Sequence, residues 1–580
     1  MDTILRIDMS GAGGPKARVE PVGQYAGLGG RGMTSLMVTN EVDPLCHPLS
    51  AANKLVIAPG LLTGTSASTS GRLSVGCKSP LTGGIKESNA GGQAAIALAR
   101  LGYAAVVLEG KPPTEDLWKI VINKDGVTFS KCNELKMLGN YDTIEKLRVI
   151  HGEKVAYMTL GQAGEMKLTN ASIACTDREL HPTRHCGRGG VGAVMGAKRV
   201  KAIIIDEAGT STRQPKFPDK FKAAGKVFAE GLKKHAVSGQ ALPAYGTNVL
   251  TNILNEAGGY PTNNFKTGRF EGGSKLSGEA LAALENKRGG EGSATHGCHR
   301  GCIIQCSGIF NDAEGKYVTK QPEYETVWSH GGHCGIDDLD VVAKLDRMDD
   351  DFGLDTIESG VTIGVAMEGG VIPFGDGQGA INLLAEVGKG TPMGRVIGSG
   401  AGLTGKVFGV ERVPVVKNQA LPAYDPRAIQ GIGVTYATST MGADHTAGYA
   451  IATNILKVGG YVDPLATEGQ VDLSRNLQIA TAAIDATGMC LFIAFPLLDQ
   501  PDTFQALLDL LNSFYGLELT GDGVVALGKK ILSAERDFNK RAGFGPEHDR
   551  LPRFFTEEPV APHNVVFKIK DEELDKLFNW

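Results

Sequence analysis

Cysteine and aromatic residues are scarce in this chain of 580 residues, which holds ten cysteines and 6% aromatic residues. So few cysteines cannot make a disulfide scaffold, and cysteines that cluster in a reducing compartment usually bind metal or carry redox chemistry. Long apolar runs are also missing, because the most apolar stretch, residues 94–110, is interrupted by Arg100 and Gly102. That stretch is too short to span a bilayer, so we expect no membrane insertion.

A strong charge imbalance is absent as well. The formal net charge is only −5, which argues against nucleic acid or an anionic membrane as the partner. The first eleven residues, "MDTILRIDMSG", contain no basic segment followed by a long apolar stretch. We therefore expect no signal peptide and a cytoplasmic location.

Glycine is abundant, with 79 residues, and the length predicts two to four domains. Residues 1–208 contain short β-rich runs, such as "KLVIAPG" and "KAIIID", separated by glycine turns, which predicts an α+β base domain dominated by β-sheet. Helical periodicity then prevails in residues 209–415 and in residues 416–580. The predicted fold class is α+β, with an N-terminal β-sheet base domain followed by two mostly α-helical domains.

The segment "HGCHRGCIIQCSG" places Cys298, Cys302 and Cys306 four residues apart. A [4Fe–4S] cluster needs four thiolates, and a distant fourth ligand is common. Zinc is the competing interpretation, since His296 and His299 lie in the same segment. A third interpretation is that these are buried cysteines without a ligand, although their regular spacing disfavours it. The candidate fourth ligand is Cys490, which favours a redox role.

Two short segments share a skeleton. Asp350-Asp351-Phe352-Gly353-Leu354-Asp355 and Asp485-Ala486-Thr487-Gly488-Met489-Cys490 both read D-x-x-G after a helix-like stretch. Glycine that merely ends two unrelated helices would explain the likeness. The alternative is a pair of equivalent loops whose acceptors bind two halves of a ligand rich in N–H groups.

Two glycine-rich loops, residues 68–92 and 185–196, each contain an arginine, Arg72 or Arg188. Backbone N–H groups of such loops can approach an anion, and arginine binds phosphate with two hydrogen bonds. Neither loop has a nucleotide-binding fingerprint. Tight turns in a glycine-rich domain are the simpler alternative for each loop taken alone.

Together these residues resemble the tungsten-containing aldehyde ferredoxin oxidoreductase family. The similar segments follow that family's order along nearly the whole chain: "KLVIAPGLLTGTSASTSGR", "CKSPLTG", "GRGGVGAVMGAKRVKAI", "PEYETVW", "FGLDTI", "LPAYDPR" and "DATGMCLF". The resemblance implies a tungsten ion held by two pterins at the junction of the domains. It also implies one adjacent [4Fe–4S] cluster and a Mg²⁺ ion between the pterin phosphates.

The resemblance also implies roles for individual residues. The cluster ligands would be Cys298, Cys302, Cys306 and Cys490. From the sheet domain, the pterin contacts would be Arg72, Asn89, Gly91, Arg188 and Gly189. From the two D-x-x-G loops, they would be Asp350, Asp355, Asp485 and Met489.

The implied reaction is oxidation of an aldehyde to the carboxylic acid, with water as oxygen source. Glu325 would act as general base, because a carboxylate in a dry pocket has a raised pKa. His445 would donate a hydrogen bond to the carbonyl oxygen. Without the resemblance, a paired helix-terminal glutamate and a satisfied buried imidazole are the simpler interpretations. The electron acceptor would be ferredoxin or an iron–sulfur subunit.

This chain departs from the family pattern in three places. Its first cysteine gap has one residue more than the usual C-x2-C-x3-C, so cluster exposure and potential can differ. Lys344 and Arg347 occupy the positions of an E-x-x-H pair that binds a bridging mononuclear iron in dimeric relatives, so we expect any oligomer to lack that iron. Residues 330–334 add His330, His333 and Cys334, to which the sequence assigns no role.

Those extra histidines motivate a second hypothesis, the catalytic subunit of a class II benzoyl-CoA reductase, where they would deliver protons to a ring. A third is an inactive electron-transfer or structural subunit, which retention of Glu325 and His445 disfavours. The sequence does not distinguish tungsten from molybdenum, because the two ions have nearly the same size and ligand preferences, and it does not name the aldehyde.

Overall fold

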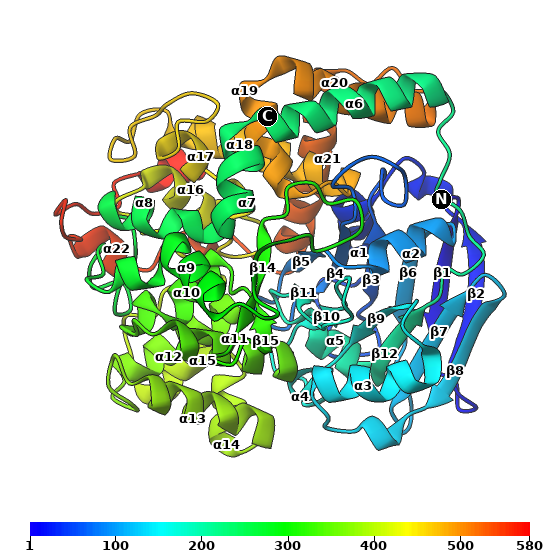
Figure 1. The fold of residues 1–580 in the computed structure, drawn as a ribbon, viewed down its shortest axis with the longest axis horizontal. Helices are drawn as coiled ribbons and strands as arrows, with labels where there is room; N and C mark the ends of the chain where they lie inside the picture. The colour runs from blue at the N-terminus through cyan, green and yellow to red at the C-terminus, as the bar shows by residue number, and fades with distance from the viewer.

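The computed structural model, which describes residues 1–580, begins with two mixed six-stranded sheets, drawn in blue and cyan in Figure 1. The first has the order β2-β1-β6-β3-β4-β5: β1 (Thr3–Asp8), β2 (Lys16–Pro21), β3 (Leu55–Pro59), β4 (Leu73–Lys78), β5 (Ile85–Ala90) and β6 (Tyr103–Glu109). The second has the order β11-β10-β9-β12-β7-β8: β7 (Trp118–Asn123), β8 (Gly126–Lys131), β9 (Ala156–Thr159), β10 (Ile173–Cys175), β11 (Arg184–Cys186) and β12 (Val200–Ile205).

The two sheets have the same topology. Each starts with an antiparallel hairpin, β1–β2 or β7–β8, and ends with a strand parallel to the first, β6 or β12. A long helix follows each hairpin, α1 (Gly30–Glu41) or α3 (Asn140–His151), and a short helix precedes each last strand, α2 (Ala94–Arg100) or α5 (Val191–Ala197). The first 208 residues therefore contain a structural repeat, whose copies we call unit 1 (residues 3–109) and unit 2 (residues 118–205).

Apolar side chains on alternate faces of a strand pack against different layers of the molecule. In β1, Leu5 and Ile7 face the second sheet in the core shared by both units, whereas Ile4 packs with Met33 and Met37 of α1 on the opposite face. This period of two is the expected consequence of the pleat. α3 covers the outer face of the second sheet through residues such as Ile144. Unit 1 and unit 2 therefore share one core, and each carries its own covering helix.

The remaining chain is mostly helical, as predicted. Its first half contains these elements: α6 (Pro218–Lys234), α7 (Leu242–Tyr245), α8 (Leu250–Glu256), α9 (Gly278–Arg288), β13 (Ser293–His296), β14 (Ser307–Asn311), β15 (Tyr317–Lys320), α10 (Tyr324–His330), α11 (Leu339–Phe352), α12 (Thr356–Glu368), α13 (Gly377–Lys389), α14 (Pro392–Ile397) and α15 (Ala401–Phe408). Unit 2 contains one further helix, α4 (Gln162–Glu165). The α+β fold class, with sheets first and helices after, is confirmed.

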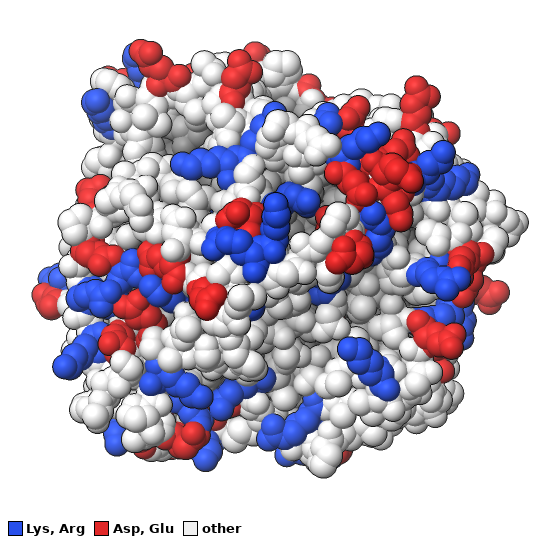
Figure 2. Space-filling model, turned by 180° about the vertical axis from the view of Figure 1, so that it is seen from behind, with Lys and Arg blue, Asp and Glu red and all other residues white.

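The second half completes the helical part: β16 (Val415–Val416), β17 (Gln419–Ala420), α16 (Gln430–Thr438), α17 (Ile451–Asn454), α18 (Gln470–Thr487), α19 (Ala494–Asp499), α20 (Pro501–Tyr515), α21 (Gly521–Arg541), α22 (Phe554–Glu557) and α23 (Asp571–Leu574). α6 runs alongside α20 at the top of Figure 1 and packs against it, although nearly 270 residues separate them. None of the helices combines the length and the apolar character needed to cross a bilayer. Figure 2 shows both signs of charge interspersed on the rear face.

The two D-x-x-G loops dock on the two units at equivalent places. α11 ends at Gly353 and α18 ends at Gly488, both with positive φ (76° and 81°). The Gly488 carbonyl accepts from the Arg72 N–H before β4 (3.1 Å), and the Gly353 carbonyl accepts from the Ser172 N–H before β10 (2.8 Å). Glycine therefore ends each helix, and the two loops occupy equivalent places rather than unrelated ones; that they bind two halves of a ligand stays a prediction.

Candidate functional site

All four predicted cluster cysteines line one end of a cavity of about 860 Å³. Cys298, Cys302 and Cys306 come from the loops between β13 and β14, and Cys490 comes from the loop that follows α18. The four thiols are free and partly exposed, whereas five of the other six cysteines are fully buried. The fold therefore brings the fourth, distant thiol to the local motif, and the Cys490 N–H is fixed by the Thr69 carbonyl (3.0 Å).

Two guanidinium groups lie beside the thiols, that of the half-buried Arg72 and that of the buried Arg184. A Cβ atom on Gly91 would lie 3.1 Å from the Cys298 sulfur and 3.2 Å from Arg72 Nη1, so the backbone there passes between them. Arg184 Nη2 donates to the Ser307 hydroxyl (2.8 Å), next to Cys306. Two cations facing several thiols suit an anionic metal cluster, because they offset its charge in a buried place.

The zinc alternative keeps local support. The donor atoms of Cys298, His299 and Cys302 lie within 4.8 Å of one another. His299 is 1% exposed, and its Nε2 has no hydrogen-bond partner. Metal analysis separates the two interpretations, because one predicts iron and the other predicts zinc.

A second cavity of about 220 Å³ is polar and adjoins the first. Four residues line both cavities and stand between them: Arg72, Arg184, Glu323 and Glu325. Its wall contains five of the predicted cofactor contacts: Arg72, Asn89, Gly91, Asp350 and Asp355. The structure thus brings together residues from unit 1 and from the helical part.

The other four predicted cofactor residues, Arg188, Gly189, Asp485 and Met489, line neither of these two cavities. Arg188 donates through Nε to Asp355 (3.0 Å) and through its two other nitrogens to the Ala443 and Ala420 carbonyls. Gly189 has a φ of +80° and packs on Lys86. Asp485 faces Arg31, with 3.4 Å between Oδ2 and Nη1. Met489 is 1% exposed in an apolar core cluster, so its side chain turns away from the polar cavity.

Unit 1 and unit 2 carry a side-chain pair at equivalent hairpin positions, of which Arg72, Asn89 and His185 line this cavity. In the β4–β5 hairpin, Arg72 Nε donates to Asn89 Oδ1 (2.6 Å). In the β10–β11 hairpin, the equivalent residues are Ser172 and His185, whose Oγ and Nδ1 lie 2.7 Å apart. The sequence prediction missed Ser172 and His185. The signal that could have found them is their place in a repeat that is visible only once the strands are paired.

The two equivalent loop carboxylates have opposite pKa shifts. Burial alone would raise the pKa of Asp350, but Lys320 and His185, at 2.7 Å and 3.1 Å, outweigh it and lower the pKa to about 2. Burial raises the pKa of Asp485 to about 7, and the nearby Glu87 adds to this, against the effect of Arg31. Lys320, which the sequence prediction also missed, therefore favours the ionised carboxylate of Asp350, whereas burial favours the protonated form of Asp485.

Glu325 and His445 meet where the two cavities join. Glu325 Oε1 and His445 Nε2 lie 3.3 Å apart, and both side chains are about 15% exposed, toward the cavity. Glu325 Oε2 accepts from the Ala423 N–H (3.0 Å), whereas Oε1 has no well-aligned hydrogen bond. Burial raises the pKa of Glu325, and His445 opposes the shift. A fixed carboxylate with one free oxygen can therefore accept a proton here.

The extra histidines do not reach either cavity. His330 Nε2 and Asp349 Oδ2 lie 2.6 Å apart, and both side chains are fully buried. His333 packs against Phe265 and Trp328, and burial lowers its pKa to about 3, so it stays neutral. The proton-delivery role considered for these histidines is wrong, because they are core residues.

Lys344 and Arg347 lie on α11. Lys344 is exposed, and the Arg347 guanidinium stacks 3.2 Å over the ring of Tyr141. Arg347 therefore packs on unit 2, and the expected lack of a bridging iron stays a prediction.

The donor set fits both implied cofactors. Four free thiols beside the guanidinium groups of Arg72 and Arg184 suit a [4Fe–4S] cluster. The polar cavity offers carboxylates and an amide to pterin N–H groups, together with buried groups that have no partner in the protein, such as Glu325 Oε1, Arg184 Nε and His445 Nδ1. Buried polar groups without partners are rare, so they indicate a bound group.

Two family models match most of the chain. "Aldehyde ferredoxin oxidoreductase, N-terminal domain" matches residues 4–207, and "Aldehyde ferredoxin oxidoreductase, domains 2 & 3" matches residues 223–579. The tungsten-containing aldehyde ferredoxin oxidoreductase of Pyrococcus furiosus is 36% identical over 581 residues, covering 95% of this chain and 92% of the relative. That of Thermococcus kodakarensis is 35% identical over 604 residues, covering 99% and 95%.

Two more distant proteins are also similar to this chain. The aliphatic sulfonate oxidoreductase, WOR-like subunit, of Pyrococcus furiosus is 24% identical over 591 residues, covering 92% of this chain and 86% of the relative. A solved structure, the active-site complex BamBC of benzoyl coenzyme A reductase with 1,5-dienoyl-CoA, superposes with a TM-score of 0.80 at 18% identity, covering 99% and 93%. At that identity the superposition shows the fold alone.

Proposed function

Because this chain belongs to the aldehyde ferredoxin oxidoreductase family, we propose that it oxidises an aldehyde to the carboxylic acid. The family and the oxidoreductase class are those predicted from the sequence. In the reaction, aldehyde and water give acid, two protons and two electrons. The observation that carries the proposal is the contact of Glu325 with His445 at the junction of the thiol-lined and polar cavities.

The proposed cofactors are a tungsten or molybdenum bis-pterin, one [4Fe–4S] cluster and a Mg²⁺ ion between the pterin phosphates. Cys298, Cys302, Cys306 and Cys490 would hold the cluster, and the two D-x-x-G loops with the Arg72–Asn89 and Ser172–His185 pairs would hold the pterins. When bound, these groups accept an electron pair and pass single electrons to ferredoxin or an iron–sulfur subunit. We place the reaction in the cytoplasm, and any oligomer would lack the bridging mononuclear iron.

Glu325 acts as general base in this proposal. Its Oε2 is fixed by the Ala423 N–H, so Oε1 is the oxygen that accepts the proton from the water or hydrated aldehyde. Burial raises its pKa from the ordinary value of 4.5, which makes it a better base while leaving it ionisable.

His445 orients the carbonyl oxygen. Its Nε2 faces both Glu325 and the cavity, and its Nδ1 lies 3.8 Å from Asp444. An N–H donor at this point stabilises the negative charge that develops on oxygen when the carbonyl carbon is attacked. The Tyr424 ring lies next to the imidazole, with 5.8 Å between ring centroids, and limits its movement.

The structure favours an aldehyde over the benzoyl-CoA hypothesis. The arginines that line the large cavity, Arg72 and Arg184, lie at its thiol end, and no lysine lines it. The phosphates of a CoA ester would therefore find no cation along the rest of the cavity. An inactive subunit is disfavoured because Glu325 and His445 stand together with free polar atoms.

Metal content and turnover of the anaerobically purified protein test this proposal. We expect about one tungsten or molybdenum and four iron atoms per chain, and reduction of a viologen dye that depends on an aldehyde. Zinc without tungsten, molybdenum or iron would reject the redox assignment. Both metals without aldehyde turnover would reject the substrate, and an acyl-CoA substrate panel would then decide.

A further inference from the structure

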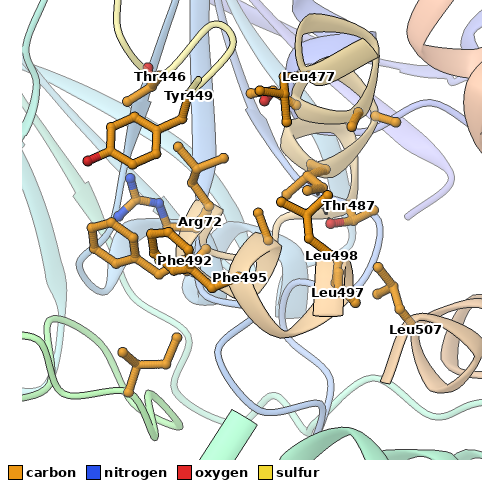
Figure 3. Close-up of a pocket in the computed structure, with 18 of the residues that line it drawn as sticks. Arg72, Thr446, Tyr449, Leu477, Thr487, Phe492, Phe495, Leu497, Leu498 and Leu507 are labelled. Carbon is orange, nitrogen blue, oxygen red and sulfur yellow. Dashed lines mark hydrogen bonds between the residues drawn. The ribbon is translucent and has the colours of Figure 1, made fainter. Parts of the chain in front are cut away.

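The large cavity extends well beyond the proposed reaction centre. From Glu325, His445 and the thiols it continues between the C-terminal helices, where α18, α19, α20 and the start of α21 form its wall. Figure 3 shows this change of character: Arg72 and Tyr449 stand at one side, Phe492 and Phe495 lie next to them, and leucines follow beyond. We call this outer part, lined by residues 477–527, the apolar sleeve.

Helical spacing builds the wall of the sleeve. On α20, Phe504, Leu507, Leu508 and Leu511 follow the i, i+3, i+4, i+7 pattern and line the cavity together. On α18, the corresponding stripe contains Leu477, Ala480, Thr481 and Ile484. α20 packs on α6, and α18 packs on α16 and α21. The two stripes therefore belong to helices that pack on different neighbours, and both line the same cavity.

No charged side chain lines the sleeve. Between Leu477 and Leu527 the polar lining residues are Thr481, Thr487, Cys490 and Tyr515. The Thr487 hydroxyl donates to the Ile484 carbonyl (2.6 Å), and the Tyr515 hydroxyl donates to the Leu61 carbonyl (2.6 Å). Both donors are used inside the protein, so the sleeve offers a ligand apolar contact and very little hydrogen bonding.

The sleeve also reaches the surface. Leu498 of α19 is 39% exposed and Leu517, after α20, is 53% exposed, and both line the cavity. Large apolar residues that stay exposed at the mouth of an apolar cavity are typical of a binding site, since apolar surface is otherwise withdrawn from water.

We propose that the apolar sleeve binds the hydrocarbon chain of the substrate, and that the substrate is an aldehyde with an extended, uncharged apolar chain. This inference rests on the proposed aldehyde oxidation. The aldehyde group lies at Glu325 and His445, and the chain runs past Phe492 and Phe495 between α18 and α20 toward Leu498. Small or charged aldehydes gain little from this site, because they leave the sleeve unfilled or bring a charge into it.

Chain length tests the inference on the holoenzyme. We expect kcat/KM for propanal, hexanal and octanal to rise about fourfold per added methylene, which corresponds to about 0.8 kcal/mol for each buried CH₂. Succinic semialdehyde, which carries a carboxylate, should be turned over more slowly than hexanal. An equal kcat/KM for all three alkyl aldehydes overturns the inference and leaves the proposed function intact, whereas no turnover of any aldehyde overturns both.

A variant in the sleeve localises the effect. Leu497→Asp should lower kcat/KM for octanal at least tenfold and leave propanal within about twofold, because only the longer chain reaches this residue of α19. Val149→Asp is the matched control: Val149 is 85% exposed on α3, away from the cavity, and the substitution should change neither substrate. If Leu497→Asp does not fold, Leu498→Asp at the exposed mouth replaces it. Equal loss with both aldehydes contradicts the inference.

Binding provides a readout that needs no turnover. The uncharged fluorophore N-phenyl-1-naphthylamine should bind wild-type holoenzyme, and 1-octanol should displace it at far lower concentration than 1-propanol does. The Leu497→Asp protein should lose this difference. No displacement by 1-octanol in the wild type overturns the inference even if aldehydes are oxidised.

Discussion

Unit 1 and unit 2 share a topology, a hydrogen-bonded pair at the equivalent hairpin positions and a helix-ending glycine docked beside it. They differ in the chemistry of the docked loops. In the D-x-x-G loop that docks on unit 1, the last residue is Cys490, which lines the large cavity with the other three thiols. The equivalent residue of the loop that docks on unit 2 is Asp355, which binds Arg188 at 3.0 Å. One backbone arrangement thus carries two different side chains at the equivalent position, and only the one in the loop on unit 1 lies with the thiols.

The electrostatics separate the units further. Lys320 and His185 hold the pKa of Asp350 at about 2, whereas burial and Glu87 raise the pKa of the equivalent Asp485 to about 7. Equivalent backbone positions therefore do not imply equivalent ionisation. The neighbours of each carboxylate come from distant parts of the chain, so the repeat does not extend to them.

The largest expected effect comes from replacing Glu325, which lines both cavities. It tests whether the reaction takes place where the two cavities meet. Glu325→Gln should lower kcat by roughly 10² to 10⁴, the scale for loss of a general base. Metal contents should stay at the wild-type values, because Glu325 would hold no metal. Turnover and metal analysis on the same preparation check both.

Two controls sharpen that result. Glu285→Gln, a buried glutamate of α9 that lines neither cavity, should keep wild-type kcat. In the wild type, kcat/KM should rise with pH on an acidic limb centred above 4.5, because Glu325 must be ionised to accept a proton and burial raises its pKa. A limb that persists unchanged in Glu325→Gln would assign it to another group.

The next effect concerns the thiol that distinguishes the loops. Cys490→Ser should lower iron per chain well below the wild-type value and change the spectrum of the reduced cluster, because serine oxygen is a poor substitute for thiolate. Asp355→Asn, the equivalent change in the other loop, should leave iron unchanged. Equal iron in both variants would remove Cys490 from the ligand set and erase the difference between the loops.

The docking of the two D-x-x-G loops should be equally sensitive, in unit 1 and in unit 2, to a methyl group added where the loop meets the unit. A Cβ on Gly60 would lie 2.0 Å from the Gly488 nitrogen, and one on Gly161 would lie 2.3 Å from the Phe352 carbonyl carbon. Because backbone must move in either case, Gly60→Ala and Gly161→Ala should each lower the free energy of unfolding by about 3 kcal/mol.

A third glycine provides the control for this pair. Gly13, with nothing within 4 Å of its Cβ position, should tolerate alanine within about 0.5 kcal/mol. Denaturant unfolding compares the three variants, and a large loss in only one unit would show that the docking is not equivalent.

The smallest expected effect concerns the carboxylates of Asp350 and Asp485. It is measured as the free energy of unfolding of protein that has been produced without cofactor. The pKa of Asp350 is lowered from 3.8 to about 2, so its ionised form stabilises the fold above pH 3.8, and this contribution is lost as pH falls through about 2. Asp350→Asn should therefore cost about 2 kcal/mol at neutral pH.

Asp485 should behave in the opposite way. Its pKa is raised from 3.8 to about 7, so its contribution is present below pH 3.8 and is lost as pH rises through about 7. Asp485→Asn should flatten that decline. The same slope in both variants would contradict the electrostatic difference between the units.

Much of the local chemistry could be predicted from the sequence. The thiol spacing of Cys298, Cys302 and Cys306, the sheet-then-helix order and the two D-x-x-G segments depend on residues close together in the chain, where spacing is informative. The resemblance carried Glu325 and His445, which no local pattern singles out. The proton-delivery role considered for His330 and His333 was wrong, because the sequence alone does not distinguish a core imidazole from one that faces a cavity.

The tertiary structure alone decided the rest. The equivalence of Arg72–Asn89 with Ser172–His185 needs the strands to pair, and the opposite pKa shifts of Asp350 and Asp485 need Lys320 and Glu87 beside them. The apolar sleeve exists because α18 and α20 pack on other helices and leave their apolar stripes facing each other. The sequence by itself determined which groups and which helices are present. Electrostatic shifts and cavities arise between residues that are far apart in the chain, so only the packed chain sets them.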